Sequence, residues 1–200
     1  MQFETAEEVA PRRFRLTGLL RAQAGTEDAA AAGAPVGSPF VLLDEALIPA
    51  GVSPSEIGQP LRWRVTPAGR ALDDEAAIDV TQALGERALL PLSPVHLRGR
   101  FDPTGALVLD WIRRSRANAD RWEGIEIPLG EEIERYRVEI ADGTGRRIGI
   151  ETAEPAATLS PERLDAAFGA EPAVLDIAVA QMSLAVGAGT PRRLRLSRGP

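Results

Sequence analysis

The 200-residue chain contains no cysteine and no lysine, and His96 is its single histidine. Without cysteine it can form neither a disulfide framework nor a thiolate-ligated zinc or iron–sulfur centre. Without lysine it lacks the amine that Schiff bases and phosphate-binding loops use. One histidine cannot build a multi-histidine metal site within one chain. We therefore expect no enzymatic activity, no metal site and no cofactor.

Positive charge is also in short supply. The chain has 23 basic residues, all arginine, and 29 acidic residues, which gives a net charge of −6. This balance disfavours nucleic acid as a partner. No apolar run approaches the roughly 20 residues that cross a bilayer, and the acidic start is not a signal peptide, so the chain should not be membrane-embedded. Because 15 of the 23 arginines follow residue 91, we expect the partner surface in the second half.

Turn-forming residues are abundant, with 19 glycines and 16 prolines. Short apolar or alternating runs lie between them, which predicts an all-β fold. The strands expected in the first half are 14–21, 40–43 (buried) and 61–65, and those in the second half are 95–101, 106–114, 135–140, 146–152, 174–186 and 193–196. Short helices are expected at 53–58 and 160–169, where Ser-Pro pairs begin them and glycines end them.

A rigid Leu92-Ser93-Pro94 joint suggests a domain boundary. We predict a small antiparallel β domain, a barrel or sheet, over residues 1–91. A β-sandwich with a short helix should follow over residues 92–200.

The second half resembles a fibronectin type III module. A proline-led first strand is followed by the turn Asp102-Pro103-Thr104-Gly105, a strand that ends near Trp111, and a strand that holds Tyr136. Gly187-x-Gly189 ends the penultimate strand. The resemblance implies two packed sheets with Trp111 and Tyr136 inside. Leu175 stands where many such modules have tyrosine, so no tyrosine corner is expected.

Across the whole chain, from about residue 9 to residue 196, ordered blocks are similar to a second family. It is the C-terminal part of the large baseplate or host-specificity protein of gene transfer agents, which are phage-tail-like particles. The blocks are residues 12–27, 40–44, 67–70, 92–97, 111–116 and 122–131.

This resemblance implies a structural or adhesion component of a tail tip or baseplate, and a chain that is the C-terminal part of a larger tail protein, cut out or encoded separately. Its partners would be neighbouring tail proteins, or a glycan or protein of the host envelope. It would be assembled in the bacterial cytoplasm and located at the tail tip of the virion. The family's hub and glycosidase-like domains have no counterpart in these residues.

One polar loop, over residues 115–130, carries a candidate binding site. Trp122 could stack on a sugar ring while Arg121, Asp120 and Arg116 bond its hydroxyls. The same tryptophan could instead hold the loop on the sandwich, with arginine stacked on its ring. The alternative function is therefore a carbohydrate-binding or carbohydrate-processing accessory domain.

Other polar clusters have simpler interpretations. His96 could be a general base, but a packed or hydrogen-bonded structural histidine is favoured, and it is simply solvent-exposed if the strand phase places it outward. Asp73–Glu75 with Asp79 lacks the order of a calcium loop, which favours a solvated acidic loop. Glu131–Glu134 could supply a carboxylate pair for glycoside hydrolysis, although an outward polar face is favoured. The arginines of the cluster 113–116 are expected to form ion pairs.

Overall fold

The computed structural model describes residues 1–117, 127–169 and 172–198. Contacts divide the chain into two compact units, one made of residues 1–32 and 89–200 and the other of residues 33–88. The proposed domain boundary between residues 91 and 92 stays a prediction.

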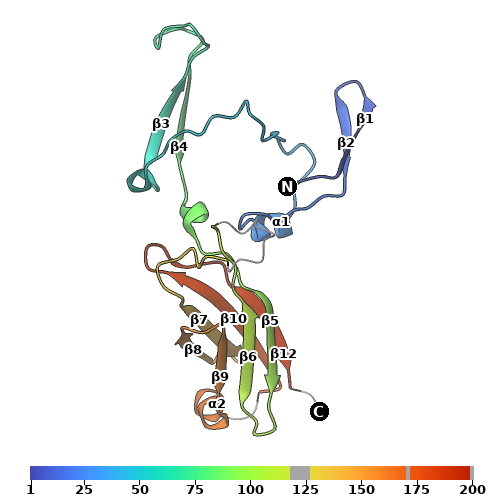
Figure 1. The fold of residues 1–200 in the computed structure, drawn as a ribbon, viewed down its shortest axis with the longest axis vertical. Helices are drawn as coiled ribbons and strands as arrows, with labels where there is room; N and C mark the ends of the chain where they lie inside the picture. The colour runs from blue at the N-terminus through green and yellow to red at the C-terminus, as the bar shows by residue number, and fades with distance from the viewer. Residues whose placement is uncertain (118–126, 170–171, 199–200) are drawn as a thin grey trace. The chain divides into compact units, whose positions relative to one another are not determined.

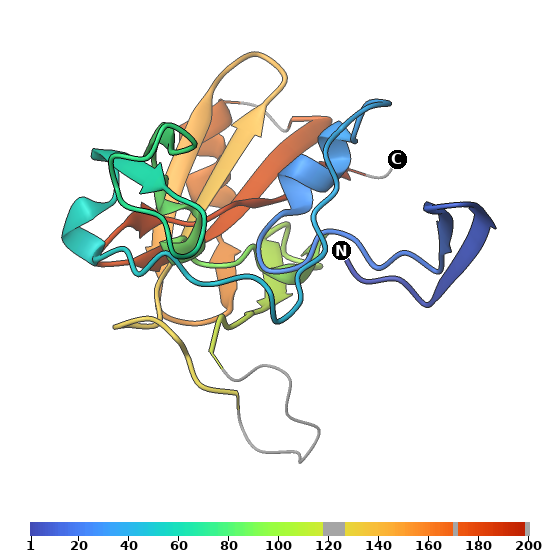
Figure 2. The same ribbon diagram turned by 90° about the horizontal axis from the view of Figure 1, so that it is seen from above.

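Two antiparallel sheets form the second half of the chain. One has the strand order β5-β6-β9, with β5 (Val95–Phe101), β6 (Leu107–Ile112) and β9 (Ala156–Leu159). The other has the order β8-β7-β10-β12, and β11 pairs with the end of β10. Its strands are β7 (Tyr136–Asp142), β8 (Arg147–Thr152), β10 (Val174–Ser183), β11 (Gly187–Ala188) and β12 (Arg192–Ser197). In Figure 1, β10 crosses behind β6, and Figure 2 shows the same ribbon from above. This connectivity is that of a fibronectin type III module, so the predicted fold class is confirmed.

The core lies between the two sheets, and the strands build it by strict alternation. In β6 and β7 every second residue is buried, because successive side chains of a strand point to opposite faces. The Trp111 and Tyr136 rings meet edge to face, with centroids 5.2 Å apart. Tyr136 is fully buried and Trp111 is 4% exposed. Other core residues are Leu107, Leu109, Val138, Ile140, Leu159, Leu175, Ile177 and Val179. The two predicted core aromatics are thus confirmed.

The helix α2 (Pro161–Phe168) follows β9 (Figure 1), and capping residues fix where it begins and ends. The Ser160 side chain accepts a hydrogen bond from the Arg163 N–H at the N-cap, and Gly169 takes the left-handed conformation at the C-cap (φ 69°). Leu164 and Phe168 lie one turn apart, so both reach the core. The helix predicted over 160–169 is therefore confirmed.

Two hairpins of the sandwich end in the same kind of turn. The Asp102 carboxylate accepts hydrogen bonds from the Thr104 hydroxyl (2.6 Å), the Thr104 N–H and the Ala106 N–H. These bonds, first that of the Thr104 hydroxyl, lower the pKa of Asp102. Gly105 has a φ of 85°, which only glycine adopts readily. Asp142 forms the equivalent turn at the end of β7.

The first 91 residues form two separate two-stranded hairpins, where we expected one barrel or sheet. The hairpins are β1–β2 (Thr5–Ala10, Arg13–Thr17) and β3–β4 (Pro60–Val65, Ile78–Ala83). The short helices are α1 (Glu27–Ala32), η1 (Pro54–Glu56) and η2 (Glu86–Leu89). The strand predicted at 61–65 and the helical turn predicted at 53–58 are confirmed. The buried strand expected at 40–43 is wrong, because these residues pair with no described strand and all four are exposed by more than half.

Candidate functional site

The predicted binding loop, between β6 and β7, is fastened at its base by arginines. The guanidinium of Arg113 donates hydrogen bonds to the carbonyl oxygens of Ile127 (2.7 Å) and Pro128 (3.2 Å). Arg116 donates to the Glu131 carboxylate at 2.9 and 3.1 Å. These bonds join residues that leave β6 to residues that approach β7. The base of the loop is therefore fixed by charge-assisted bonds.

The acidic residues on the return side of the loop are engaged as well. Glu132 accepts hydrogen bonds from the Ser183 hydroxyl (3.2 Å) and the Leu184 N–H (3.1 Å). Bonds from its own backbone N–H and from Leu184 lower the pKa of Glu132. The Tyr136 hydroxyl donates to Glu134 at 2.7 Å, and burial, followed by this bond, raises the pKa of the phenol.

These contacts correct the expectation of an outward polar face at 131–134 for one residue, because Glu132 is exposed whereas Glu131 is not. The Glu131 side chain is only 3% exposed, and each of the three glutamates has a different partner. Burial of a carboxylate costs free energy unless a cation and hydrogen bonds compensate it. Arg116 supplies both to the Oε1 atom of Glu131, while Oε2 is buried without a hydrogen-bond partner among the described residues. The glutamates fasten the loop and the strand ends, a role that alternation alone did not indicate.

A hollow of about 420 Å³ adjoins this base. It is lined by Leu89, Arg116, Gly130, Glu131, Glu132, Ser183, Ala185 and Val186. Gly130 has a φ of 75°, and a Cβ atom there would lie 2.8 Å from the Ser115 hydroxyl oxygen, so the loop needs glycine at this point. Carboxylates, a guanidinium and small apolar side chains thus meet in one hollow at the foot of the loop.

Of the four predicted binding residues, only Arg116 can be placed. It lines the hollow and is bound to Glu131. Asp120, Arg121 and Trp122 lie outside the described residues, so their role in binding stays a prediction. The ion pairs expected of the arginine cluster are confirmed, because Arg116 pairs with Glu131 and Arg114 pairs with Glu27 near α1.

The remaining candidates are His96 and the acidic residues between 73 and 79. His96 is exposed, with φ at 53°, where the β5–β6 pairing has a bulge. Its side chain lies on the exposed face of β5 with Arg98 and Arg100, where the alternation of the strand places it. The expectation of a packed histidine is therefore wrong, and the solvent-exposed alternative holds. Asp79 accepts bonds from Arg62 and Arg64, and Asp74 accepts one from Arg70. Within 1–117, 127–169 and 172–198, no three ligand-type side chains are placed to hold a metal ion.

None of the described helices is both long and apolar enough to cross a membrane.

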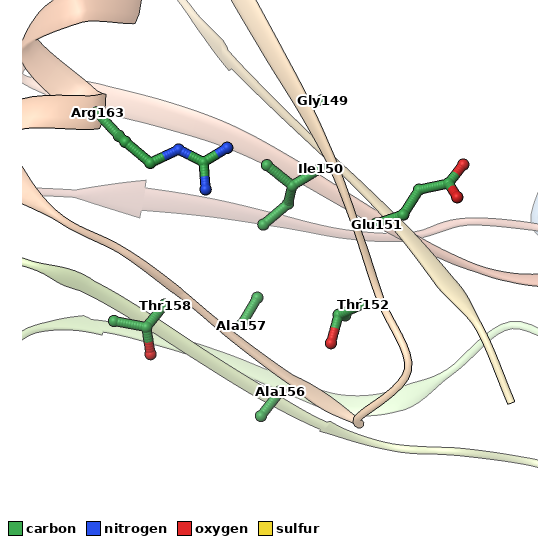
Figure 3. A pocket seen from close by; sticks show the side chains of 8 residues that line it. All are labelled: Gly149, Ile150, Glu151, Thr152, Ala156, Ala157, Thr158 and Arg163. Atoms are coloured by element: carbon green, nitrogen blue, oxygen red, sulfur yellow. The ribbon is translucent and has the colours of Figure 1, made fainter.

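A second hollow, of about 380 Å³, opens between the edge strands β8 and β9. Ile150 and Ala157 form its apolar part, and Arg163 extends from α2 toward Ile150 (Figure 3). The Glu151 carboxylate points away from Arg163 (Figure 3) and pairs with Arg137 (3.4 Å) and Arg135 (3.9 Å). Nothing in the sequence pattern marked this hollow, because it arises where the chain passes from one sheet to the other.

The hairpin β3–β4 has one polar face and one apolar face. Arg62, Arg64 and Asp79 form ion pairs of 3.0 and 3.4 Å on the polar face. The opposite face carries Leu61, Trp63, Val65, Ile78 and Val80. Val65 and Ile78 are 60% and 63% exposed, so this apolar face is largely uncovered. The strand β4 was not predicted, although the alternation Ile78-x-Val80 could have indicated it.

The hairpin β1–β2 repeats this arrangement on a smaller scale. Leu16 and Phe14 pair with Ala6 and Glu8, which places them on one face, and Phe14 is 57% exposed. Glu7 and Arg15 form an ion pair on the other face. Both of these uncovered apolar faces lie in the first half of the chain. This observation competes with the expectation that the partner surface lies in the arginine-rich second half.

Comparisons with known proteins give a partial family match. Residues 1–41 match the family model described as Rcc01698-like, C-terminal. No curated protein sequence matches the chain.

Solved structures that are similar to the chain include an extracellular region and a fibronectin type III domain. The extracellular domains d3–d4 of rat CD45 are 7% identical, with 97% of this chain and 94% of that chain covered and a TM-score of 0.40. A fibronectin type III domain derived from the human KIAA0970 protein is 21% identical, with 56% of this chain and 79% of that chain covered and a TM-score of 0.37. At these scores the fold assignment rests on the strand order described above.

Proposed function

We propose that this chain is a non-enzymatic structural component of a phage-tail-like particle, at its tip or baseplate. Its task there is to bind neighbouring tail proteins. The ordered blocks that resemble gene transfer agent baseplate proteins and the family match over residues 1–41 support this setting. The rigid sandwich suits a module that presents loops and surfaces to partners.

The observation that carries the proposal is the pair of uncovered hairpin faces. A two-stranded hairpin is marginally stable in water and needs a third strand or a covering element. Both hairpins instead expose large apolar side chains, including Phe14, Val65 and Ile78. Exposed apolar patches of this kind mark interaction sites. We infer that a neighbouring tail protein covers them in the assembled particle.

Incorporation into particles tests this function. Val65→Ser and Ile78→Ser together replace two strongly exposed side chains of the apolar face of β3–β4. Thr81→Ser on the opposite face is the matched control. Particles purified from producing cells should contain the wild-type chain and the control at equal levels, and at least several-fold less of the double variant. The proposal is wrong if the wild-type chain is absent from particles, or if the double variant is incorporated as well as the control.

One observation favours the alternative of carbohydrate binding. The 420 Å³ hollow at the base of the loop combines carboxylates with Arg116 and lies at the foot of the segment that contains Trp122. Sugar sites use the same combination of charged side chains and an aromatic ring. Binding of envelope glycans to immobilised chain should then fall at least tenfold in Trp122→Ala, while Trp63→Ala, in the hairpin β3–β4, binds like the wild type. Equal binding by all three proteins would remove the glycan hypothesis.

A further inference from the structure

The strand β8 has an open edge. Its one described strand neighbour is β7, with pairs from Tyr136↔Thr152 to Ala141↔Arg147. The Asp142 N–H donates to the Arg146 carbonyl oxygen (3.0 Å). Because bonded and non-bonded pairs alternate in an antiparallel ladder, the N–H and C=O groups of Arg147, Gly149 and Glu151 point away from β7. Unpaired edge groups of this kind are a template for another strand.

The surface beside this edge is apolar and positively charged. Ile148 and Ile150 are half-buried on the inner side of β8, and Ile150 lines the 380 Å³ hollow with Ala157 and Arg163 (Figure 3). Within the described ranges, no side-chain hydrogen bond or ion pair engages the guanidinium of Arg163 or of Arg147. The carboxylate of the hollow, Glu151, is already paired with two arginines. The edge therefore fits an extended segment that carries apolar side chains and then negative charge.

The chain itself contains such a segment. Phe40, Val41, Leu42 and Leu43 are 57%, 63%, 55% and 83% exposed and belong to no described helix, strand or turn. Aromatic and β-branched residues favour strands, so this run has the composition of a strand that lacks a partner. Two carboxylates, Asp44 and Glu45, follow it immediately.

The segment matches β8 in length and in charge order. In an antiparallel arrangement with Leu43 opposite Gly149, Phe40 lies opposite Thr152 and Leu42 opposite Ile150. Phe40 and Leu42 then face the hollow, because inner and outer positions alternate. Gly149 offers room for Leu43, since a Cβ atom at this glycine would meet nothing within 4 Å.

The two carboxylates then arrive at the start of β8. This end of the strand contacts α2, because the Arg146 guanidinium donates to the Phe168 carbonyl oxygen at the end of the helix. In the register above, Glu45 lies opposite Arg147. Asp44 lies opposite Ile148, on the same face of β8 as Ile150, toward which Arg163 extends (Figure 3). The reverse strand direction would separate the carboxylates from both arginines.

We propose that residues 40–45 of a second copy of this chain add as an antiparallel strand to the free edge of β8. Each copy donates one strand and accepts another, so the interface is head-to-tail and generates rings or chains of copies. The proposal concerns self-assembly and does not depend on whether the particle is a phage tail.

The absence of cysteine makes a clean test possible. Two single-cysteine variants, Leu43→Cys and Gly149→Cys, are mixed at native conditions with an oxidant. Each chain has one thiol, so a bond between positions 43 and 149 can form only between two copies. Opposed residues of a bonded antiparallel pair lie about 5.5 Å apart at Cα, within the range of a disulfide. Gly143→Cys, in the exposed β7–β8 turn, is the matched control for Gly149→Cys.

We expect the 43–149 linked dimer to form at least tenfold faster than the 43–143 dimer. Equal rates, or no linked dimer, would overturn the proposal. Sedimentation velocity of the full chain gives a second reading: Arg163→Glu should weaken self-association about tenfold, and Asp44→Arg should restore it in the double variant. Arg193→Glu, the same charge change on the exposed side of β12, should leave association unchanged. A monomer at every concentration, or equal weakening by Arg193→Glu, would also refute it.

Discussion

Replacing Trp111 by alanine tests the account of the core directly. The side chain is 4% exposed and meets the Tyr136 ring edge to face at 5.2 Å. Truncation removes most of a large buried side chain from the core and leaves a cavity. Such a change lowers the free energy of unfolding by about 3–5 kcal/mol. The lost ring contact accounts for about 0.5–1.5 kcal/mol of this. For a chain of this size the midpoint of thermal unfolding should fall by about 6–20 °C.

The assay is denaturant unfolding followed by circular dichroism, since the substitution removes a fluorophore. Trp111→Phe, which keeps an aromatic ring, should recover more than half of the loss. Trp63→Ala is the matched control, because Trp63 lies on the uncovered face of β3–β4. It should change the free energy of unfolding of the sandwich by less than about 1 kcal/mol. If Trp111→Ala and Trp63→Ala cost the same, the two tryptophans do not differ in burial as described and the reasoning fails.

Three further outcomes follow from single contacts. Arg116→Met should destabilise the chain by about 3–5 kcal/mol because it leaves the Glu131 carboxylate buried without its cation, and adding Glu131→Gln should recover part of this loss in a double-mutant cycle. Gly189→Ala should cost about 1–3 kcal/mol, since a Cβ atom there would lie 2.3 Å from the Pro91 carbonyl oxygen; wild-type stability would contradict that contact. The pKa of Asp102 is lowered in the folded state. The contribution of Asp102 to folding stability is therefore complete above its unfolded-state pKa of about 4, and it is lost as the pH falls through its folded-state pKa. Asp102→Asn should therefore flatten the loss of stability below about pH 4, and an unchanged slope in acid titration would contradict this.

The sandwich could be predicted from the sequence because its signals are local. Alternation over 135–140 and the Asp-x-Thr-Gly turns specify strands that pair with their neighbours along the chain. Trp111 and Tyr136 could be assigned to the core because one large aromatic pair fills the space between two sheets. β9 was missed because Ala156–Leu159 is a short strand without strong alternation. Its existence depends on pairing with β6, which is a tertiary contact.

The candidate site was less predictable because its chemistry depends on pairing across the loop. Glu131 and Arg116 are 15 residues apart, and no spacing rule for strands or turns places them together. Alternation placed Glu132 and Glu134 in one phase of a strand edge and did not indicate that the loop turns the Glu131 side chain inward onto Arg116. His96 lies on the exposed face of β5 with Arg98 and Arg100, where the alternation of that strand places it.

The position of a partner surface is the inference in which sequence and structure diverge most. A count of arginines pointed to the second half, yet Arg114, Arg116 and Arg137 there are engaged with acidic side chains. Paired charges on a surface contribute little to binding a new partner, since their electrostatic requirements are already met. The first half has fewer arginines but leaves the apolar side of Leu61-Arg62-Trp63-Arg64-Val65 uncovered. Alternation states which face of a strand is apolar, and it says nothing about what covers that face. For this chain the uncovered apolar faces and the open edge of β8 beside Arg147 and Arg163, and not the total number of arginines, indicate where partners should be sought.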